Sequence, residues 1–316
     1  MTRHPRDPLA QSVKQRLMNR CKQSGEDFNV LLTRYAIERF LYRLTCTPHA
    51  SRFTLKGAVL FAIWMDKPHR PTIDVDLLGA GDPNVDDLRN VFQEVCDADA
   101  EPDGMRYDAP SVRAEEIRED NIYQGIRVKL TGYLGSARIP VQVDVGFGDV
   151  ITPGPAEATF GPLLDLPPPV MAAYPPETVI AEKLEAMVAL GMANSRMKDF
   201  FDLYVLSRTM SFDGDVLVGA VRATFNRRRT AIPTAPPPVL SREFASDAAK
   251  RALWSAFARR IDADRGVVVR RGKGRKMGER SVGSSSAVIV HLEDLVDTRD
   301  QTRRCDGARL TCQLTG

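Results

Sequence analysis

Two aspartates separated by a single residue lie in the segment 70–77, which reads Arg-Pro-Thr-Ile-Asp-Val-Asp-Leu. Because side chains alternate along a strand, we expect Thr72, Asp74 and Asp76 on one face and aliphatic residues on the other. The two carboxylates then stand side by side, roughly 7 Å apart at their backbones. The segment 141–145, Val-Gln-Val-Asp-Val, alternates in the same way and offers Asp144 as a third carboxylate.

Three carboxylates that converge on a water-accessible face repel one another unless a divalent cation lies between them. Oxygen ligands of this kind suit Mg²⁺ or Mn²⁺. Asp74, Asp76 and Asp144 are therefore candidate metal ligands for phosphoryl or nucleotidyl transfer. An Asp-x-Asp pair alone is more often structural, since short carboxylates cap turns at strand ends. The functional interpretation depends on the combination of this pair with a second acidic strand and a preceding turn.

That turn is Leu55-Lys56-Gly57-Ala58, and an apolar helix is expected directly after it, over residues 58–65. A helix N-terminus beside a glycine can point backbone N–H groups and the positive end of its dipole at an anion. A single glycine is weak evidence alone. Together with the acidic strands, the turn predicts a phosphate cradle next to a metal platform.

The composition sets limits on the class of protein. The chain has 316 residues, 43% of them hydrophobic, and a net charge of only +3, so any contact with nucleic acid must come from local patches. Five cysteines without Cys-x-x-Cys spacing favour reduced thiols over disulfides or zinc. No segment approaches the roughly 20 apolar residues of a membrane span, and the first residues lack a signal-peptide core. We therefore expect a cytoplasmic protein without membrane contact.

The periodicity of apolar residues predicts a chain that mixes helices and strands. Helices are expected over residues 8–24, 27–44, 58–65, 86–98, 177–190, 197–208, 216–225 and 241–261, and further strands over 111–117, 123–134 and 138–145. Prolines at 167–169 and, after Tyr174, at 175–176 bracket a linker, because consecutive prolines prevent helix. From residue 265 onward, cations alternate with glycine and serine, which indicates either a disordered basic tail or an altered reading frame.

Two sets of charged residues allow two interpretations each. Lys183 lies at the margin of a buried helical stripe, and Asp199 shares an apolar face with Asp202, so these carboxylates need a cation. Lys183 or Arg196 could supply it structurally, or Lys183 and Asp199 could serve a nucleotide.

Arg127 and Lys129 share one face of their strand, which is either the face bearing Asp144 or a solvated edge. Glu182 and Glu185 are expected to face solvent.

The motifs taken together resemble a known family. They are Leu55-Lys56-Gly57, Arg70-x-Thr72-x-Asp74-x-Asp76, Val143-Asp144-Val145, Glu182-Lys183-Leu184-x-Ala186 and Arg196-x-Lys198-Asp199-x-x-Asp202-Leu203. Over residues 25–262 the chain resembles the AbiEii/AbiGii nucleotidyltransferase-like toxins of bacterial abortive-infection toxin–antitoxin pairs. Many members have Gly-Gly-Ser/Thr where this chain has Gly57-Ala58-Val59, so a hydroxyl that would contact the phosphates is missing.

The resemblance implies an α+β nucleotidyltransferase-like fold, with a small mixed sheet and a helical C-terminal half that closes the cleft. The corresponding divisions are a core over 1–166, a helical part over 167–264 and the tail over 265–316. It also implies transfer of a nucleotidyl group from a nucleoside triphosphate to a tRNA, with Mg²⁺ or Mn²⁺ as cofactor and a cognate AbiEi-like antitoxin as partner.

The resemblance further assigns roles to individual residues. Catalysis would involve Asp74, Asp76, Asp144, Lys183 and Asp199, and nucleotide binding would involve Lys56, Gly57, Arg70, Thr72 and Lys183. Two alternatives remain open from the residues themselves. One is a metal-dependent nuclease or phosphodiesterase that uses the same carboxylates with water as acceptor. The other is a nucleotide-binding module without turnover.

Overall fold

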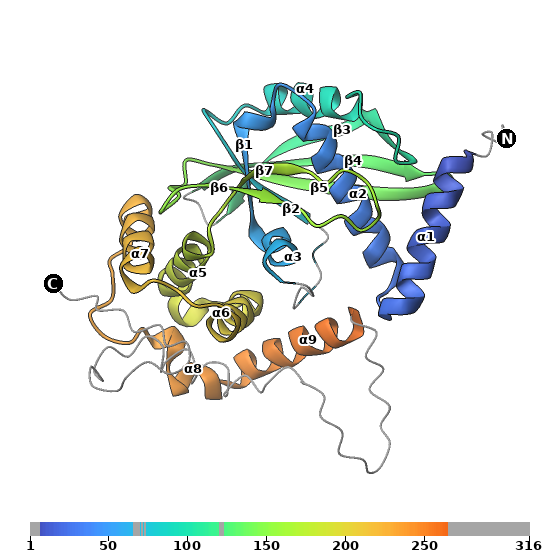
Figure 1. Cartoon of the computed structure of the whole chain (residues 1–316). Coiled ribbons are helices and arrows are strands. Elements are labelled where there is room, and N and C mark those ends of the chain that lie inside the picture. Colours follow the sequence, from blue (N-terminus) through green and yellow to red (C-terminus); the bar gives the residue numbers. More distant parts are fainter. Residues whose placement is uncertain (1–6, 66–69, 71, 73, 120–122, 265–316) are drawn as a thin grey trace, which may run out of the picture. The chain divides into compact units, whose positions relative to one another are not determined.

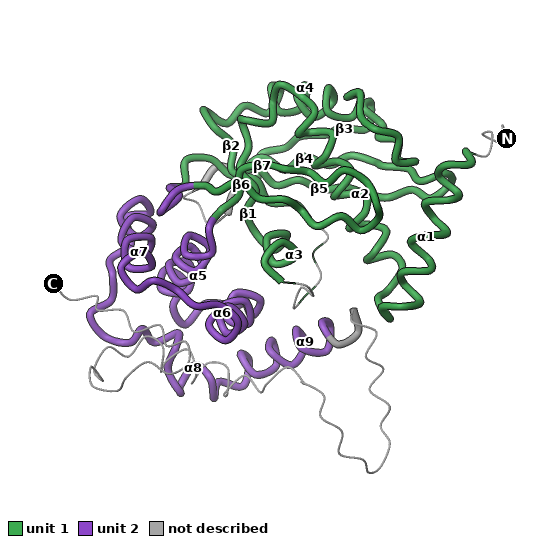
Figure 2. The backbone as a smooth tube through the Cα atoms, in the orientation of Figure 1, with its two compact units in different colours: residues 1–149, 155–174, 264–266 green, residues 150–154, 175–263, 267–316 purple. Residues whose placement is uncertain are grey.

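The computed structural model describes residues 7–65, 70, 72, 74–119 and 123–264 (Figure 1). The predicted tail over 265–316 lies outside them. Figure 2 shows that the chain forms two compact units. Unit 1 contains the chain up to residue 149 and residues 155–174, and unit 2 contains residues 150–154 and 175–263.

Unit 1 is built on one seven-stranded sheet with the strand order β3-β4-β5-β2-β1-β7-β6. The strands are β1 (Phe53–Lys56), β2 (Asp74–Gly79), β3 (Met105–Glu119), β4 (Tyr123–Leu134), β5 (Ala137–Phe147), β6 (Ala156–Thr159) and β7 (Val170–Ala173). The pairs β2–β5 and β1–β7 are parallel and the other neighbours are antiparallel. The predicted α+β class with a mixed sheet is confirmed.

The helices of unit 1 are α1 (Pro8–Ser24), α2 (Phe28–Thr45), α3 (Leu60–Trp64) and α4 (Val85–Cys96). Side chains of Asp7, Asp27 and Asn84 accept backbone N–H groups at the starts of α1, α2 and α4, which is how short polar residues begin a helix. The short apolar helix expected over 58–65 is a 3₁₀ turn over Gly57–Val59 that continues into α3.

Aromatic side chains join α2 and α4 to one face of the sheet. Phe40 of α2 stacks on Phe92 of α4 with ring centroids 5.8 Å apart, and Phe53 of β1 meets Phe92 edge-on at 5.7 Å. Phe53 and Leu55 are buried on this face, whereas Lys56, one residue further, points to the opposite face. The helices α2 and α4 therefore cover the side of the sheet away from the predicted carboxylates (Figure 1).

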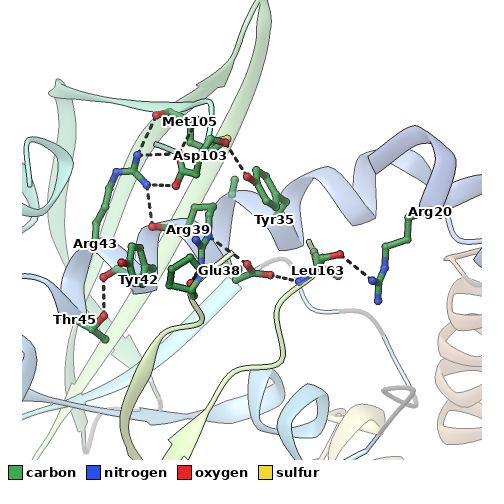
Figure 3. A network of polar contacts seen from close by, with 12 residues as sticks. Arg20, Tyr35, Glu38, Arg39, Tyr42, Arg43, Thr45, Asp103, Met105 and Leu163 are labelled. Atoms are coloured by element: carbon green, nitrogen blue, oxygen red, sulfur yellow. Dashed lines mark hydrogen bonds and ion pairs between the residues drawn. The ribbon is translucent and has the colours of Figure 1, made fainter. Parts of the chain in front are cut away.

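A buried polar network holds α2 to the rest of unit 1 (Figure 3). Arg43 donates to both carboxylate oxygens of Asp103, at 2.6 and 3.0 Å. Glu38 accepts the backbone N–H of Leu163 at 2.8 Å, and Arg39 donates to the backbone carbonyl of Pro167. Through these bonds, α2 fixes the connection between β6 and β7.

Unit 2 consists mainly of helices. They are α5 (Pro176–Leu190), α6 (Met197–Thr209), α7 (Gly214–Arg228), α8 (Arg242–Ser246) and α9 (Ala248–Asp264). Ala181 of α5 packs against Ala220, Val221 and Phe225 of α7 in a buried cluster. None of the helices in the described part of the chain is long and apolar enough to cross a membrane.

Two expectations about chain segments need correction. The segment bracketed by prolines is more than a linker, because it contains β7, whose Ala173 pairs with Leu55 of β1. The single helix expected over 241–261 is broken at Asp247, whose backbone is non-helical and whose carboxylate accepts the N–H of Lys250. The short strands β1 and β6 were not expected.

Candidate nucleotidyl-transfer site

The three predicted carboxylates stand on one face of the sheet, on two adjacent parallel strands. Asp76 of β2 is the register partner of Asp144 of β5, and Asp74 is the partner of Gln142. The alternating burial of both strands places all three aspartates on the half-buried face and the intervening valines in the core. As the alternation in the sequence predicts, the aspartates lie on the face opposite to the core residues.

Asp144 is bound by an arginine from the next strand. Arg127 of β4 is its register partner, and donates from Nε to Oδ1 at 2.8 Å and from Nη2 to Oδ2 at 2.7 Å. Gln142 adds a bond from Nε2 to Oδ2 at 3.3 Å. Of the two positions considered for Arg127, the face that bears Asp144 is correct, while Lys129 pairs with the exposed Glu115.

Gly57 shows why the turn beside the aspartates requires glycine. Its φ of +73° lies in the left-handed region, which side chains with a Cβ rarely adopt. A Cβ at this position would also overlap the carboxylate of Asp76. The side chain of Asp76 therefore packs directly over the α-carbon of Gly57, which places the turn against the acidic strand.

Lys56 occupies the same face at the end of β1, where it is the register partner of Asp76. Its ammonium binds Asp149 at 2.9 Å and lies 5.7 Å from the ring centroid of Tyr174. Neither Asp149 nor Tyr174 was singled out from the sequence. Asp149 lies just after β5, whereas Lys56 is in β1, so the periodicity within a single strand could not indicate their contact.

Arg70 and Thr72 precede β2. The guanidinium of Arg70 lies over the ring of Phe61 of α3, 5.7 Å from its centroid. The hydroxyl of Thr72 donates to the backbone carbonyl of Asp74 at 3.0 Å. Arg70 thus lies against the helix that follows the glycine turn, and Thr72 holds the start of the acidic strand.

The donor set fits a hard divalent cation in its chemistry, because it consists of carboxylate oxygens from register neighbours. Among the described residues, however, no group of three or more His, Cys, Asp or Glu side chains is arranged to hold a metal ion. Arg127 engages both oxygens of Asp144.

The remaining two predicted site residues, Lys183 and Asp199, belong to unit 2. Lys183 of α5 binds Asp199 at 2.6 Å and Asp202 at 2.9 Å, and Arg196 binds Asp199 at 2.7 Å. Asp199 and Asp202 are 1% and 0% exposed, so their charges must be neutralised within the protein. Both cations that the sequence indicated as partners of these carboxylates, Lys183 and Arg196, bind them in the structure.

The charge balance in this cluster decides the protonation state of Asp199. Burial by itself would raise the pKa of this carboxyl, but the charges of Lys183 and Arg196 outweigh burial and hold the pKa below its ordinary value. Asp199 is therefore ionised at neutral pH. The cluster is an ion network with a lysine at its centre.

The expectation that Glu182 and Glu185 face solvent is wrong. Glu185 is buried and accepts hydrogen bonds from Arg228 at 2.8 Å and from the hydroxyl of Thr230. Glu182 lies 3.5 Å from Arg228. The missed partners are more than 40 residues away along the chain, at the end of α7, so the pattern within α5 could not indicate them.

Comparison with known protein families identifies the family of the chain. Residues 39–267 match the family described as nucleotidyl transferase AbiEii toxin of type IV toxin–antitoxin systems. No curated protein sequence matches the chain.

Two solved structures from Helicobacter pylori are similar at 13% sequence identity. The protein JHP933 has a TM-score of 0.39, with 62% of this chain and 78% of that one covered. A proposed nucleotidyltransferase has a TM-score of 0.42, with 84% of this chain and 97% of that one covered.

The family match defines the class as nucleotidyltransferases and spans most of the chain. The chain belongs to the AbiEii family of nucleotidyl transferase toxins of type IV toxin–antitoxin systems.

Proposed function

We propose that this protein is a metal-dependent toxin that transfers a nucleotidyl group from a nucleoside triphosphate to a hydroxyl of an acceptor RNA, specifically a tRNA. The observation that carries the proposal is the register pairing of Asp76 with Asp144, with Asp74 on the same face and the Gly57 turn packed against Asp76. Carboxylates placed in this way suit the binding of a divalent cation beside a phosphate chain.

Asp74, Asp76 and Asp144 are the residues that would hold Mg²⁺ or Mn²⁺. When bound, such an ion neutralises charge on the triphosphate and lowers the pKa of the acceptor hydroxyl. Asp76 is held in place by its packing on Gly57, and the register of β2 and β5 places Asp144 beside Asp76.

Nucleotide binding would rest on the residues around the turn. The backbone N–H groups at Gly57 would contact phosphate, since the chain lacks a hydroxyl at Val59. Lys56 and Arg70 would supply positive charge on the same part of unit 1, and Thr72 would fix the entry to β2.

In the reaction, the acceptor hydroxyl releases its proton to water while its oxygen attacks the α-phosphorus and forms the new P–O bond. The bond from the α-phosphorus to the oxygen that bridges it to the β-phosphorus breaks, and pyrophosphate leaves with the electron pair. Lys183 would offset charge on the departing pyrophosphate, and Asp199 would orient the Lys183 ammonium through their 2.6 Å contact. A cognate AbiEi-like antitoxin would restrain this activity in the cytoplasm.

The test is incubation of the purified protein with each α-labelled nucleoside triphosphate, Mg²⁺ and total RNA. We expect label in the tRNA fraction with one or more of the four nucleotides, and none when the metal is chelated. Asp76→Asn should reduce labelling by a factor on the order of 10² or more, because it removes a charge at the transferring group. Glu157→Gln, on the exposed face of β6, is the matched control and should label as the wild type does.

Other outcomes separate the alternatives. Shortened RNA without transferred label would replace the proposal with a metal-dependent nuclease. Nucleotide binding with neither transfer nor cleavage would replace it with a binding module. Label in RNA other than tRNA would retain the reaction and overturn the acceptor.

A further inference from the structure

Four charged residues form one row across four adjacent strands. Lys56 of β1 pairs with Asp76 of β2, Asp76 pairs with Asp144 of β5, and Asp144 pairs with Arg127 of β4. Register partners in a sheet point to the same side, so the four side chains share one face. Two carboxylates are flanked by one cation at each end, which makes the row neutral as it stands.

Arg127 and Asp144 form the tightest contact within this row. Two parallel N–H···O bonds join the guanidinium to the carboxylate, at 2.8 and 2.7 Å. This fork geometry is the one in which arginine recognises carboxylates and phosphates alike. Because both oxygens of Asp144 are engaged, a metal ion and Arg127 compete for the same acceptor atoms.

The pair is open enough to separate without disrupting the core. The side chains of Arg127 and Asp144 are 31% and 16% exposed, whereas the valines on either side of Asp144 are fully buried. Partly exposed ion pairs are weak compared with buried ones. A divalent cation can therefore displace the guanidinium at small cost.

Arg127 also interacts electrostatically with Asp74. Its pKa is raised, chiefly by the hydrogen bonds to Asp144; burial acts in the opposite direction, and the charges of Asp144 and Asp74 add to the increase. An arginine guanidinium is not deprotonated in proteins, so Arg127 is charged whether or not it remains bound to Asp144.

We propose that Arg127 is an exchangeable counter-ion: it holds Asp144 while no metal is bound, and turns to a phosphate group of the triphosphate when a divalent cation takes Asp144. This inference rests on the proposed function, since it takes Asp144 as a metal ligand. It explains how two adjacent carboxylates are tolerated before the metal binds. It also supplies a phosphate-binding arginine to a chain that has no hydroxyl at Val59.

A permanent structural clamp makes the opposite prediction. If Arg127 only orients Asp144 for the metal, then removing Arg127 should weaken metal binding. If Arg127 competes with the metal, then removing it should strengthen metal binding while weakening transfer. The direction of change in metal affinity therefore separates the two roles.

The experiment measures Mn²⁺ binding to the nucleotide-free full-length protein by electron paramagnetic resonance. Arg127→Met should tighten Mn²⁺ binding by about five- to tenfold, as expected for the loss of one competing ion pair. The same variant should lower nucleotidyl transfer by a factor on the order of 10², as expected for a lost cation at the phosphates. Adding Asp144→Asn should abolish the gain in Mn²⁺ affinity.

Lys129→Met is the matched control. Lys129 lies two residues from Arg127 on the same face of β4 but pairs with the exposed Glu115 at 2.8 Å. Its removal should change Mn²⁺ affinity by less than about twofold, because exposed pairs contribute little. Should Arg127→Met fail to fold, Arg127→Lys serves instead; it loses the fork geometry and should shift Mn²⁺ affinity in the same direction.

Mn²⁺ affinity that stays the same or falls on loss of Arg127 would overturn the inference. That failure is distinct from failure of the proposed function. If the wild type labels RNA and Asp76→Asn does not, while the Arg127 variants match the wild type in both measurements, the transfer reaction stands and only the exchange is wrong. If the wild type binds no Mn²⁺ and labels no RNA, both the proposed function and the exchange of Arg127 are wrong.

Discussion

The side chain of Asp76 packs over the α-carbon of Gly57, so closely that no residue with a Cβ fits at position 57 without moving the carboxylate. The glycine turn and the acidic strand thus pack directly against each other, although 18 residues of sequence separate Gly57 from Asp76. The sequence pattern assigned Gly57 to phosphate contact alone. The structure adds that Gly57 leaves the space in which the metal-binding candidate lies.

Gly57→Ala should therefore impair the site more than it impairs folding. The positive φ costs about 1 kcal/mol in stability for a residue with a Cβ. The displaced Asp76 should weaken Mn²⁺ binding by about tenfold, as expected when a contact that positions a metal ligand is lost. Titration with Mn²⁺ and urea unfolding measure the two effects separately.

Gly25→Ala is a closely matched control for this change. Gly25 ends α1 with a φ of +74°, nearly the value at Gly57, but an added Cβ there meets nothing within 4 Å. Gly25→Ala should show the same loss of stability with unchanged Mn²⁺ affinity. Equal Mn²⁺ affinities for the two variants would contradict a role for the contact between Gly57 and Asp76 in metal binding.

Lys183→Met should destabilise unit 2. The helical pattern alone places Lys183 at the margin of a buried stripe, where methionine would be tolerated. The structure shows instead that Lys183 binds two fully buried carboxylates, Asp199 and Asp202. Removing one partner of a buried ion network costs about 3–5 kcal/mol, because it leaves charge uncompensated.

Urea unfolding of Lys183→Met measures this cost, and Lys198→Met is the control, since Lys198 is an exposed lysine of α6. A variant with the wild-type midpoint would show that Asp199 and Asp202 are neutralised without Lys183. Because loss of stability and loss of turnover would coincide at this position, transfer assays on Lys183→Met need protein shown to be folded.

The buried pair of Arg43 and Asp103 should matter far more than an exposed pair of the same residue types. Asp103 is 1% exposed, and it also accepts the backbone N–H of Met105 at 2.8 Å. Asp103→Ala should lower the free energy of unfolding by about 3–5 kcal/mol. Asp87→Ala removes the partner of Arg52 at the surface and should cost less than about 1 kcal/mol. Similar losses of unfolding free energy for the two variants would show that burial does not decide the strength of these ion pairs.

Local pattern was enough to predict most of the helices and the faces of the long strands. The helix beginnings follow from residues such as Asp27, which caps α2 through its own side chain. The shared face of Asp74 and Asp76 follows from a period of two. Such features depend on neighbours within a few residues, which is the range that sequence periodicity covers.

What could not be predicted depends on contacts between distant segments. The strands β1, β6 and β7 have four residues each, too few for alternation to stand out, and they form because neighbouring strands complete their hydrogen bonds. The register that brings Arg127 to Asp144 is likewise set by strand pairing. The same holds for Glu185, whose polarity predicts exposure until its partner Arg228 is known.

Glu38 is expected to make the stability of unit 1 depend on pH (Figure 3). Burial raises the pKa of this carboxyl from its ordinary 4.5 to about 7, while the Leu163 N–H and the charge of Arg39 act in the opposite direction. Between these two pH values the folded protein keeps a proton that the unfolded chain releases, so stability falls as pH rises from 4.5 to 7 and levels off above. The loss is at most about 3 kcal/mol.

Glu38→Gln cannot titrate at this position. Urea unfolding at several pH values should therefore show that the difference in unfolding free energy between wild type and variant shrinks or reverses by this amount between pH 4.5 and 7. Glu243→Gln, at an exposed position of α8, should leave the slope of unfolding free energy against pH as it is in the wild type. If Glu38→Gln also has the wild-type slope, the pH dependence belongs to other groups.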